Sequence, residues 1–545
     1  MKTLVRLTLS TLLALLIIPR ETSAQPTPNQ PSPPADNAGQ PPTPPADPGQ
    51  PAQPLPQPPP DTVAQPPPTP PASPAPPKAD PTVARGVEWS SLRLLREKGV
   101  ISEAEYGSAL KDLGEAGGGA DSLTLVVSKL KVTLFGFTQA DFEYNSTESC
   151  QEFCSHFLIQ KSGTYRGDHS RVVFSPRDTR FAVRFAAPEE HGIRASGLIE
   201  TDFFGPTTTS ETGTWSNPVL RIRHSYLKLE TPIVDILIGQ TGNLFGWGSN
   251  YLVTGGQEPS LPGLMYQRTS QLRITKVIKT DAVNAELAVA VERPVQMDSG
   301  IPELAAGLRL YFNKLTGHHT YYLTTSVFQP ASIAVVGDFR GFRIPEYVVG
   351  PKNANFKAGG GVSVDVFLPI IGGTKAARAG ALSFSGEFVY GLGTQDMYTA
   401  LGAAGTVIPA IPPAMAGGAA TPYVPNFDPG FAAYRADGHL ELLQWTSYIA
   451  GLEYYPPVAD GRLGLDLNYG HMQSKNTHKF ASAETATAAR GASTRDHEDF
   501  FGAGGFFDLT KQTRVGADFG LYDDNYVDGS NAKNYSVIAS GWLFF

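Results

Sequence analysis

Apolar residues alternate with polar or small residues along much of the chain, and the pattern is clearest in the last eleven residues, 535–545. A strand points successive side chains to opposite faces, so one face of this segment is uncharged. Such a face suits a wall that touches lipid, because a barrel in a bilayer is apolar outside and can be polar inside. The alternative is an edge strand of a soluble sandwich. The uncharged face consists of Tyr535, Val537, Ala539, Gly541, Leu543 and Phe545.

Similar segments recur from residue 130 onward, and counting them gives sixteen. They lie near residues 132, 177, 193, 218, 233, 268, 283, 303, 318, 354, 380, 440, 461, 498, 513 and 535. The short gaps follow even-numbered segments, at 188–192, 231–232, 279–282, 313–317, 456–461 and 510–512. Most gaps after odd-numbered segments are long, at 145–170, 241–267, 329–353, 391–439 and 471–497.

An even strand count, with short turns at one end and long loops at the other, is typical of an outer-membrane barrel whose two ends lie in the periplasm. A soluble sandwich has no reason to separate its loops in this way. We therefore predict an all-β fold, a transmembrane antiparallel β-barrel of about sixteen strands over residues 130–545. The predicted cellular location is the Gram-negative outer membrane.

The first 24 residues have the pattern of a signal peptide. Lys2 and Arg6 precede an apolar run over 7–18, and Thr22-Ser23-Ala24 offers small residues for cleavage. The run is too short for a spanning helix, which needs about 20 apolar residues. We expect an exported protein. Only 17% of residues are charged and the formal net charge is -8, so nucleic acid is not expected as a partner.

Two further segments precede the predicted barrel. Residues 25–84 are rich in proline and predict an extended or disordered linker, which is either a passive tether or a spacer that contacts the cell wall. Residues 85–119 predict a short helical module, in which Ser102 and Glu105 match a capping box. Neither helix is long enough to be stable alone, so the module either packs locally or helps the protein self-associate.

The two cysteines, Cys150 and Cys154, are separated by three residues. An exported protein meets oxidising conditions, which favours a small disulfide loop. The alternative is a metal site, but it would need further ligands and only His156 is close. We expect no metal site.

Several motifs in the first half of the predicted barrel resemble those of DcaP-type porins, which are related to the phosphate-selective porins. The resemblance implies a trimeric diffusion channel for small anionic solutes. The chain departs from the family pattern at Gly242-Asn243-Leu244-Phe245, where a tryptophan-containing segment is expected. The motifs are Gly136 with Asp141-Phe142, Glu200-Thr201-Asp202-Phe203-Phe204-Gly205, Arg221-Ile222-Arg223-His224-Ser225-Tyr226 and Gly239-Gln240-Thr241.

A sixteen-stranded barrel leaves an aqueous channel, so the inward side chains set its selectivity. The predicted inward arginines are Arg180, Arg184, Arg221, Arg223, Arg273 and Arg309. Acids on the later strands are Glu387, Asp466 and Asp518. This arrangement predicts a field across the pore that orients anionic or dipolar solutes. The alternative is neutralisation by cross-strand ion pairs with Asp141, Glu200, Asp202, Glu286 and Glu292.

The loop over 241–267 is the predicted constriction. It is aromatic and poor in charge, so it could fold into the lumen without burying ions. The alternative is a surface loop or a latch between subunits. The residues expected to act here are Phe245, Trp247, Tyr251 and Glu258.

Two other functions compete with a porin for small hydrophilic solutes: an outer-membrane enzyme and a structural barrel that anchors to the cell wall. His224, His318, His319 and His471 are present, but no nucleophile motif, metal-ligand pair or phosphate loop accompanies them. We predict that His318 and His319 are exposed at a periplasmic turn. We expect no catalysis and no cofactor. The expected partners are outer-membrane lipid, lipopolysaccharide, small solutes and further copies of the chain in a homotrimer.

Overall fold

The structure is a computed structural model, and it divides the chain into two units, Met1–Ser91 and Leu92–Phe545. It describes residues 123–127, 129–150, 159–205, 219–247, 261–294, 299–320, 326–345, 354–398, 432–434, 440–478 and 495–545. The predicted signal peptide, Pro-rich linker and helical module lie outside the described residues. Within the described residues, no helix has the length and apolar character needed to span a membrane.

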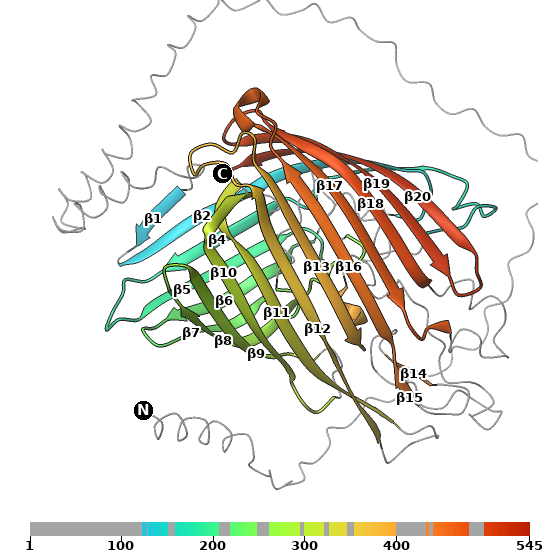
Figure 1. The fold of residues 1–545 in the computed structure, drawn as a ribbon, viewed down its shortest axis with the longest axis horizontal. Coiled ribbons are helices and arrows are strands. Elements are labelled where there is room, and N and C mark those ends of the chain that lie inside the picture. Colours follow the sequence, from blue (N-terminus) through green and yellow to red (C-terminus); the bar gives the residue numbers. More distant parts are fainter. Residues whose placement is uncertain are drawn as a thin grey trace, which may run out of the picture. The chain divides into compact units, whose positions relative to one another are not determined.

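Sixteen antiparallel strands form a closed barrel, in which each strand pairs with its neighbours along the chain (Figure 1). The predicted strand count is therefore confirmed. Two short strands, β1 (Leu123–Val127) and β3 (Arg171–Ser175), also pair with β2, and β14 (Ala432–Tyr434) with β15 (Leu440–Leu442) forms a separate ribbon. The barrel strands are β2 (Leu130–Asn145), β4 (Arg180–Ala186), β5 (Arg194–Asp202), β6 (Arg221–Glu230), β7 (Asp235–Gly242), β8 (Arg268–Ile278), β9 (Val283–Glu292), β10 (Glu303–Thr320), β11 (Ser326–Pro345), β12 (Ala354–Ile371), β13 (Leu382–Leu392), β16 (Gln444–Tyr454), β17 (Leu463–Ser474), β18 (Arg495–Asp508), β19 (Thr513–Tyr526) and β20 (Asn531–Phe544).

The last strand closes the barrel against the first. β20 pairs with β2 from Phe137↔Phe544 to Asn145↔Ser536. Beyond β20, the backbone of Phe545 exchanges two hydrogen bonds of 3.0 Å with Gly136. On the other side of β2, a Cβ atom on Gly136 would lie 2.2 Å from the carbonyl oxygen of Arg180 on β4, so the contact between β2 and β4 leaves no room for a side chain there. The C-terminal residue thus completes the ladder rather than extending past it.

The outer surface of the wall is apolar and its inner surface is mostly polar, as the alternation predicts. On β20, the outward Val537 and Leu543 are 44% and 51% exposed, whereas the inward Ser536 and Ser540 are 2% and 6% exposed. A soluble sandwich would bury its apolar faces between two sheets. An exposed apolar band around a closed barrel instead identifies a wall that faces lipid. The prediction of a membrane barrel is confirmed, and the sandwich is wrong.

Two predicted connections are wrong. Residues 313–317, predicted as a turn, lie inside β10, which continues to Thr320 beyond a bulge between Phe312 and Thr316. Most of 329–353, predicted as a long loop, belongs to the twenty-residue β11. The polar residue Asn313 interrupts the alternation because its side-chain amide donates to the carbonyl oxygen of Thr280 in the neighbouring turn, 2.8 Å away.

Candidate functional site in the barrel lumen

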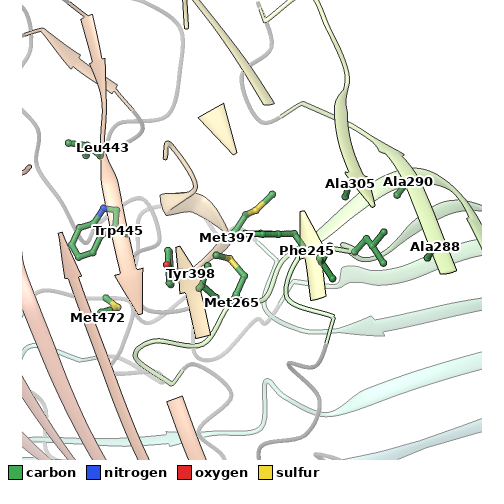
Figure 2. Packing of buried hydrophobic residues seen from close by; sticks show 13 residues of the cluster. Phe245, Met265, Ala288, Ala290, Ala305, Met397, Tyr398, Leu443, Trp445 and Met472 are labelled. Carbon is green, nitrogen blue, oxygen red and sulfur yellow. The ribbon is translucent and has the colours of Figure 1, made fainter. Parts of the chain in front are cut away.

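The connection between β7 and β8 folds into the barrel rather than over it. Its two described arms, residues 243–247 and 261–267, carry buried apolar side chains. Phe245 and Met265 are both 0% exposed. Figure 2 shows them between inward residues of β9 and β10 on one side and of β16 and β17 on the other. The cluster comprises Leu244, Phe245, Met265, Ala288, Ala290, Ala305, Val336, Val389, Met397, Tyr398, Leu443, Trp445 and Met472, with Trp247 packed against it.

Polar side chains of the wall hold the backbone of both arms. The carboxylate of Glu292 on β9 accepts the N–H of Leu244 at 2.9 Å, and that of Glu387 on β13 accepts the N–H of Met265 at 2.6 Å. Between these two anchors, the hydroxyl of Ser363 accepts the N–H of Gly246 at 3.3 Å. Glu292 and Glu387 are 2% and 5% exposed. Because both side chains are buried, water does not compete for these bonds to the backbone amides. The two acids therefore position the arms.

Arg309 on β10 fixes the first arm through Trp247. Its Nη2 donates to the carbonyl oxygen of Trp247 at 2.6 Å, and its guanidinium lies 4.5 Å from the centre of the indole ring. Arg309 is only 7% exposed. The predicted inward orientation of Arg309 is therefore found, but the arginine is covered by the loop rather than open to the channel.

A second inward segment was not predicted from the sequence. Residues 393–398 follow β13 and include the short helix η3 (Gln395–Met397). Tyr398 forms an antiparallel bridge with Met265, and the N–H of Tyr266 donates to the carbonyl oxygen of Met397 at 2.8 Å. In the sequence this segment is a short polar stretch beside a long run rich in glycine and alanine, and no periodicity marks it.

Three of the predicted arginines form ion pairs with acids of the same wall. Arg223 lies 2.9 Å from Glu200 and 2.7 Å from Asp202, and Arg221 lies 2.6 Å from Asp202. Arg180 lies 3.0 Å from Asp178 and 3.8 Å from Glu200. Three arginines and three acids leave this group without net charge. Of the acids expected as cross-strand partners, Glu200 and Asp202 pair with arginines in the structure, whereas Asp178 precedes Arg180 by two residues and was not expected.

Other arginines of this wall make contacts of a different kind. Arg273 donates to Gln271 at 2.8 Å and to the carbonyl oxygen of Gly242 at 2.6 Å. Arg184 is exposed and lies over the Phe135 ring, 4.8 Å from its centre. Arg268 at the start of β8 donates to the hydroxyl of Tyr266 at 3.2 Å.

The pKa of Tyr266 depends on the arginines of this wall. It lies in the second arm of the loop, outside the strands. Burial raises the pKa of its phenol, but the positive charges of Arg268, Arg223 and Arg180 outweigh burial and hold the pKa below its ordinary value. The positive charges of these arginines therefore outweigh burial at Tyr266, although Arg180 and Arg223 have acidic partners.

The predicted inward acids of the later strands are inward and buried: Glu387, Asp466 and Asp518 are 5%, 7% and 8% exposed. Glu387 anchors the β7–β8 loop.

Two acids of the earlier strands have neutral partners. Glu286 on β9 accepts from the hydroxyl of Tyr311 at 2.7 Å. The side chain of Asp141 on β2 accepts from Gln139 at 2.8 Å.

The predicted exposure of His318 and His319 is wrong. They are 6% and 0% exposed, because β10 continues through them and turns both side chains toward polar groups. His318 Nε2 lies 2.7 Å from the carbonyl oxygen of Thr374, and His319 Nδ1 lies 3.0 Å from Glu453 Oε2. The other two histidines are apart from these: His224 lies 2.9 Å from the Thr241 hydroxyl and His471 lies 2.9 Å from Asp499. In the described parts of the chain, no three His, Cys, Asp or Glu residues gather as metal ligands.

The first long loop, after β2, also enters the barrel. Cys150 is disulfide-bonded and 0% exposed, and Ile159 is buried beside it in a cluster with Tyr526. The N–H of Ile159 donates to Asp524 at 2.8 Å. Cys154 is the other cysteine of the sequence. Cys154, Tyr251 and Glu258 lie outside the described residues, so their predicted roles stay predictions.

Of three comparisons with known proteins, the one with solved structures found similar folds. No family model matches the chain, and no curated protein matches it. Among solved structures, the outer membrane channel DcaP of Acinetobacter baumannii is similar, with 18% identity, a TM-score of 0.51 and coverage of 77% of this chain and 98% of that chain. An anion-selective porin from Comamonas acidovorans has 12% identity and a TM-score of 0.42, with coverage of 76% and 100%. Salmonella typhi OmpF has 9% identity and a TM-score of 0.43, with coverage of 78% and 100%. The chain therefore has the fold of the DcaP outer membrane channel, as its sequence motifs suggested.

Proposed function

We propose that this protein is an outer-membrane porin through which small hydrophilic solutes diffuse, and that it prefers anions. The single observation that carries the proposal is the combination of a sixteen-stranded barrel with a loop anchored inside it. Barrels of this size have room for an aqueous channel, and an inward loop narrows such a channel without closing the wall.

The proposed anion preference rests on the wall formed by β4, β6 and β8. Arg184 and Arg268 add positive charge beside the neutral ion-paired group, and the lowered pKa of Tyr266 is the signature of a positive potential. Asp466 and Asp518, on later strands of the barrel, would make the field transverse. In this proposal, Phe245 and Trp247 belong to the constriction, together with Tyr251 and Glu258.

Two measurements test the proposal with the purified full chain. Liposomes that contain the protein should swell in small sugars and organic acids, because a channel passes them and a structural anchor does not. The reversal potential across a planar bilayer under a KCl gradient should have the sign of anion preference. A cation preference would refute the basic wall, whereas liposomes that stay impermeable would refute the porin itself.

The remaining partners are part of the same proposal. We expect a homotrimer in outer-membrane lipid and lipopolysaccharide, which the native mass of the detergent complex tests. We also propose that Cys150 bonds to Cys154, which mass spectrometry of a tryptic digest without reductant tests. The Pro-rich tether is proposed as a spacer towards the cell wall, and binding of purified peptidoglycan would test it.

A further inference from the structure

The segment over residues 393–398 enters the lumen from the side opposite the β7–β8 loop. It leaves β13 at Leu392, and its Gly393 N–H donates to the carbonyl oxygen of Leu443 at 2.7 Å. Met397 and Tyr398 are 0% and 1% exposed. Figure 2 shows both side chains against Met265 in the middle of the buried cluster. The segment and the loop therefore share one interface inside the barrel.

One arginine of the wall holds this segment. Arg340 on β11 is 3% exposed. Its Nη1 donates to Asp396 Oδ1 at 2.6 Å and its Nη2 to Asp396 Oδ2 at 3.0 Å, so the pair is bidentate. Nη1 also donates to the carbonyl oxygen of Gly393 at 2.7 Å. On its other side, the same guanidinium pairs with Glu303 of β10.

The geometry of this contact is unusually specific for a loop. A bidentate arginine–carboxylate pair fixes both distance and orientation, and its burial removes competition from water. A second contact ties the segment to β16, where Trp445 Nε1 donates to Gln395 Oε1 at 3.3 Å. The segment is therefore anchored on two strands and paired with the loop at a third point.

We infer that the constriction is built from two segments rather than one: the β7–β8 loop and residues 393–398, with the Arg340–Asp396 pair as the latch of the second. Arg340 and Asp396 are positioning residues. They hold Met397 and Tyr398 against Met265, and this contact keeps both segments in the channel. The inference rests on the proposed porin function. It adds residues 393–398 as a second specificity-determining element beside the loop over 241–267, which the sequence predicted.

Conductance of single channels tests the latch. Asp396→Asn keeps the size of the side chain and removes its charge. We expect the conductance to rise about twofold, because the narrowest section of a pore limits its current. The matched control is Asp523→Asn, which removes the same charge from an ion pair with Lys533 at 2.9 Å on the outer face of the wall. An unchanged conductance in Asp396→Asn, or an equal rise in the control, would overturn the inference.

A crosslink provides a readout that does not depend on transport. Met265 and Tyr398 are partners in an antiparallel bridge, and such pairs have Cα atoms about 4.5–5.5 Å apart, within the range of a disulfide. We expect Met265→Cys/Tyr398→Cys to crosslink under mild oxidation, and adding Asp396→Asn to lower the yield severalfold. An equal yield with and without Asp396→Asn would overturn the latch. The wild-type chain, treated alike, controls for the native disulfide.

The two experiments separate the inference from the function on which it rests. If the wild-type chain forms no channels, the porin proposal fails, whereas the crosslink still reports whether the latch exists. If the wild type conducts and the latch variant conducts equally, only the two-segment constriction fails. In the variant that combines Met265→Cys, Tyr398→Cys and Asp396→Asn, oxidation should form the crosslink and so restore the conductance towards the wild-type value.

Discussion

Replacing Arg309 by alanine should release the first arm of the β7–β8 loop. The substitution removes a hydrogen bond of 2.6 Å to the carbonyl oxygen of Trp247 and a guanidinium–indole contact at 4.5 Å. A desolvated cation–π contact contributes about 2 kcal/mol. A hydrogen bond to a charged group contributes roughly 1.5–3 kcal/mol. The two share one side chain and are not additive, so we take about 3 kcal/mol for the pair.

A loss of about 3 kcal/mol changes the equilibrium between docked and released loop roughly a hundredfold. The remaining anchors at Glu292 and Glu387 should still hold the ends of the loop. We therefore expect an arm that opens and closes rather than a loop that leaves the lumen. Single-channel recordings in a planar bilayer should show a new, higher conductance level with rapid transitions between levels.

The matched control is Arg184→Ala, which removes an equal charge from the inner wall where the arginine contacts Phe135 instead of the loop. It should change ion selectivity but keep a single conductance level. Arg309→Lys retains the charge and loses the planar stacking geometry, so it should give an intermediate frequency of transitions. An Arg309→Ala channel with the level and noise of the wild type would refute the anchoring role.

Three further predictions concern the arginine-containing wall formed by β4, β6 and β8 and the packing of strand β2. Arg268→Glu should lower the anion-to-cation permeability ratio at least about threefold in reversal-potential measurements, because it reverses a charge that lies beside Tyr266 and Arg223; an unchanged ratio would count against the basic wall. Because the pKa of Tyr266 is lowered, its phenol becomes negative at a pH below the usual tyrosine range, so the anion preference should weaken as the pH rises through that region; Tyr266→Phe should remove this step, and a step that persists would assign it to other groups. Gly136→Ala should cost about 2 kcal/mol of stability, because its methyl group would meet the carbonyl oxygen of Arg180 on the neighbouring strand β4; a thermal unfolding midpoint equal to that of the wild type would contradict this close approach of β2 and β4.

The strands were predictable because their two faces meet different solvents. Lipid outside and polar groups inside impose a period of two, and the last strand displays it from Tyr535 to Leu543. The prediction is wrong where another contact overrides the period. The side chain of Asn313 donates a hydrogen bond to the neighbouring turn. His318 and His319 are polar residues inside a strand that continues past its expected end.

The interior was only partly predictable, because it depends on contacts between segments far apart in the chain. The aromatic, charge-poor character of 241–267 identified the loop that folds inward. The role of Arg309 as an anchor depends on where Trp247 lies, and the period of β10 gives only its inward direction. The segment at 393–398 becomes visible only when Asp396 is seen beside Arg340, 56 residues away in the sequence.

The most direct test of the proposed channel is the current carried by the purified full chain in a planar lipid bilayer. We expect discrete, stable conductance steps, because each inserted barrel encloses an aqueous channel that the two inward segments narrow but do not seal. Protein that is inserted in the bilayer, as judged by protection of its strands from protease, and yet produces no current would contradict it.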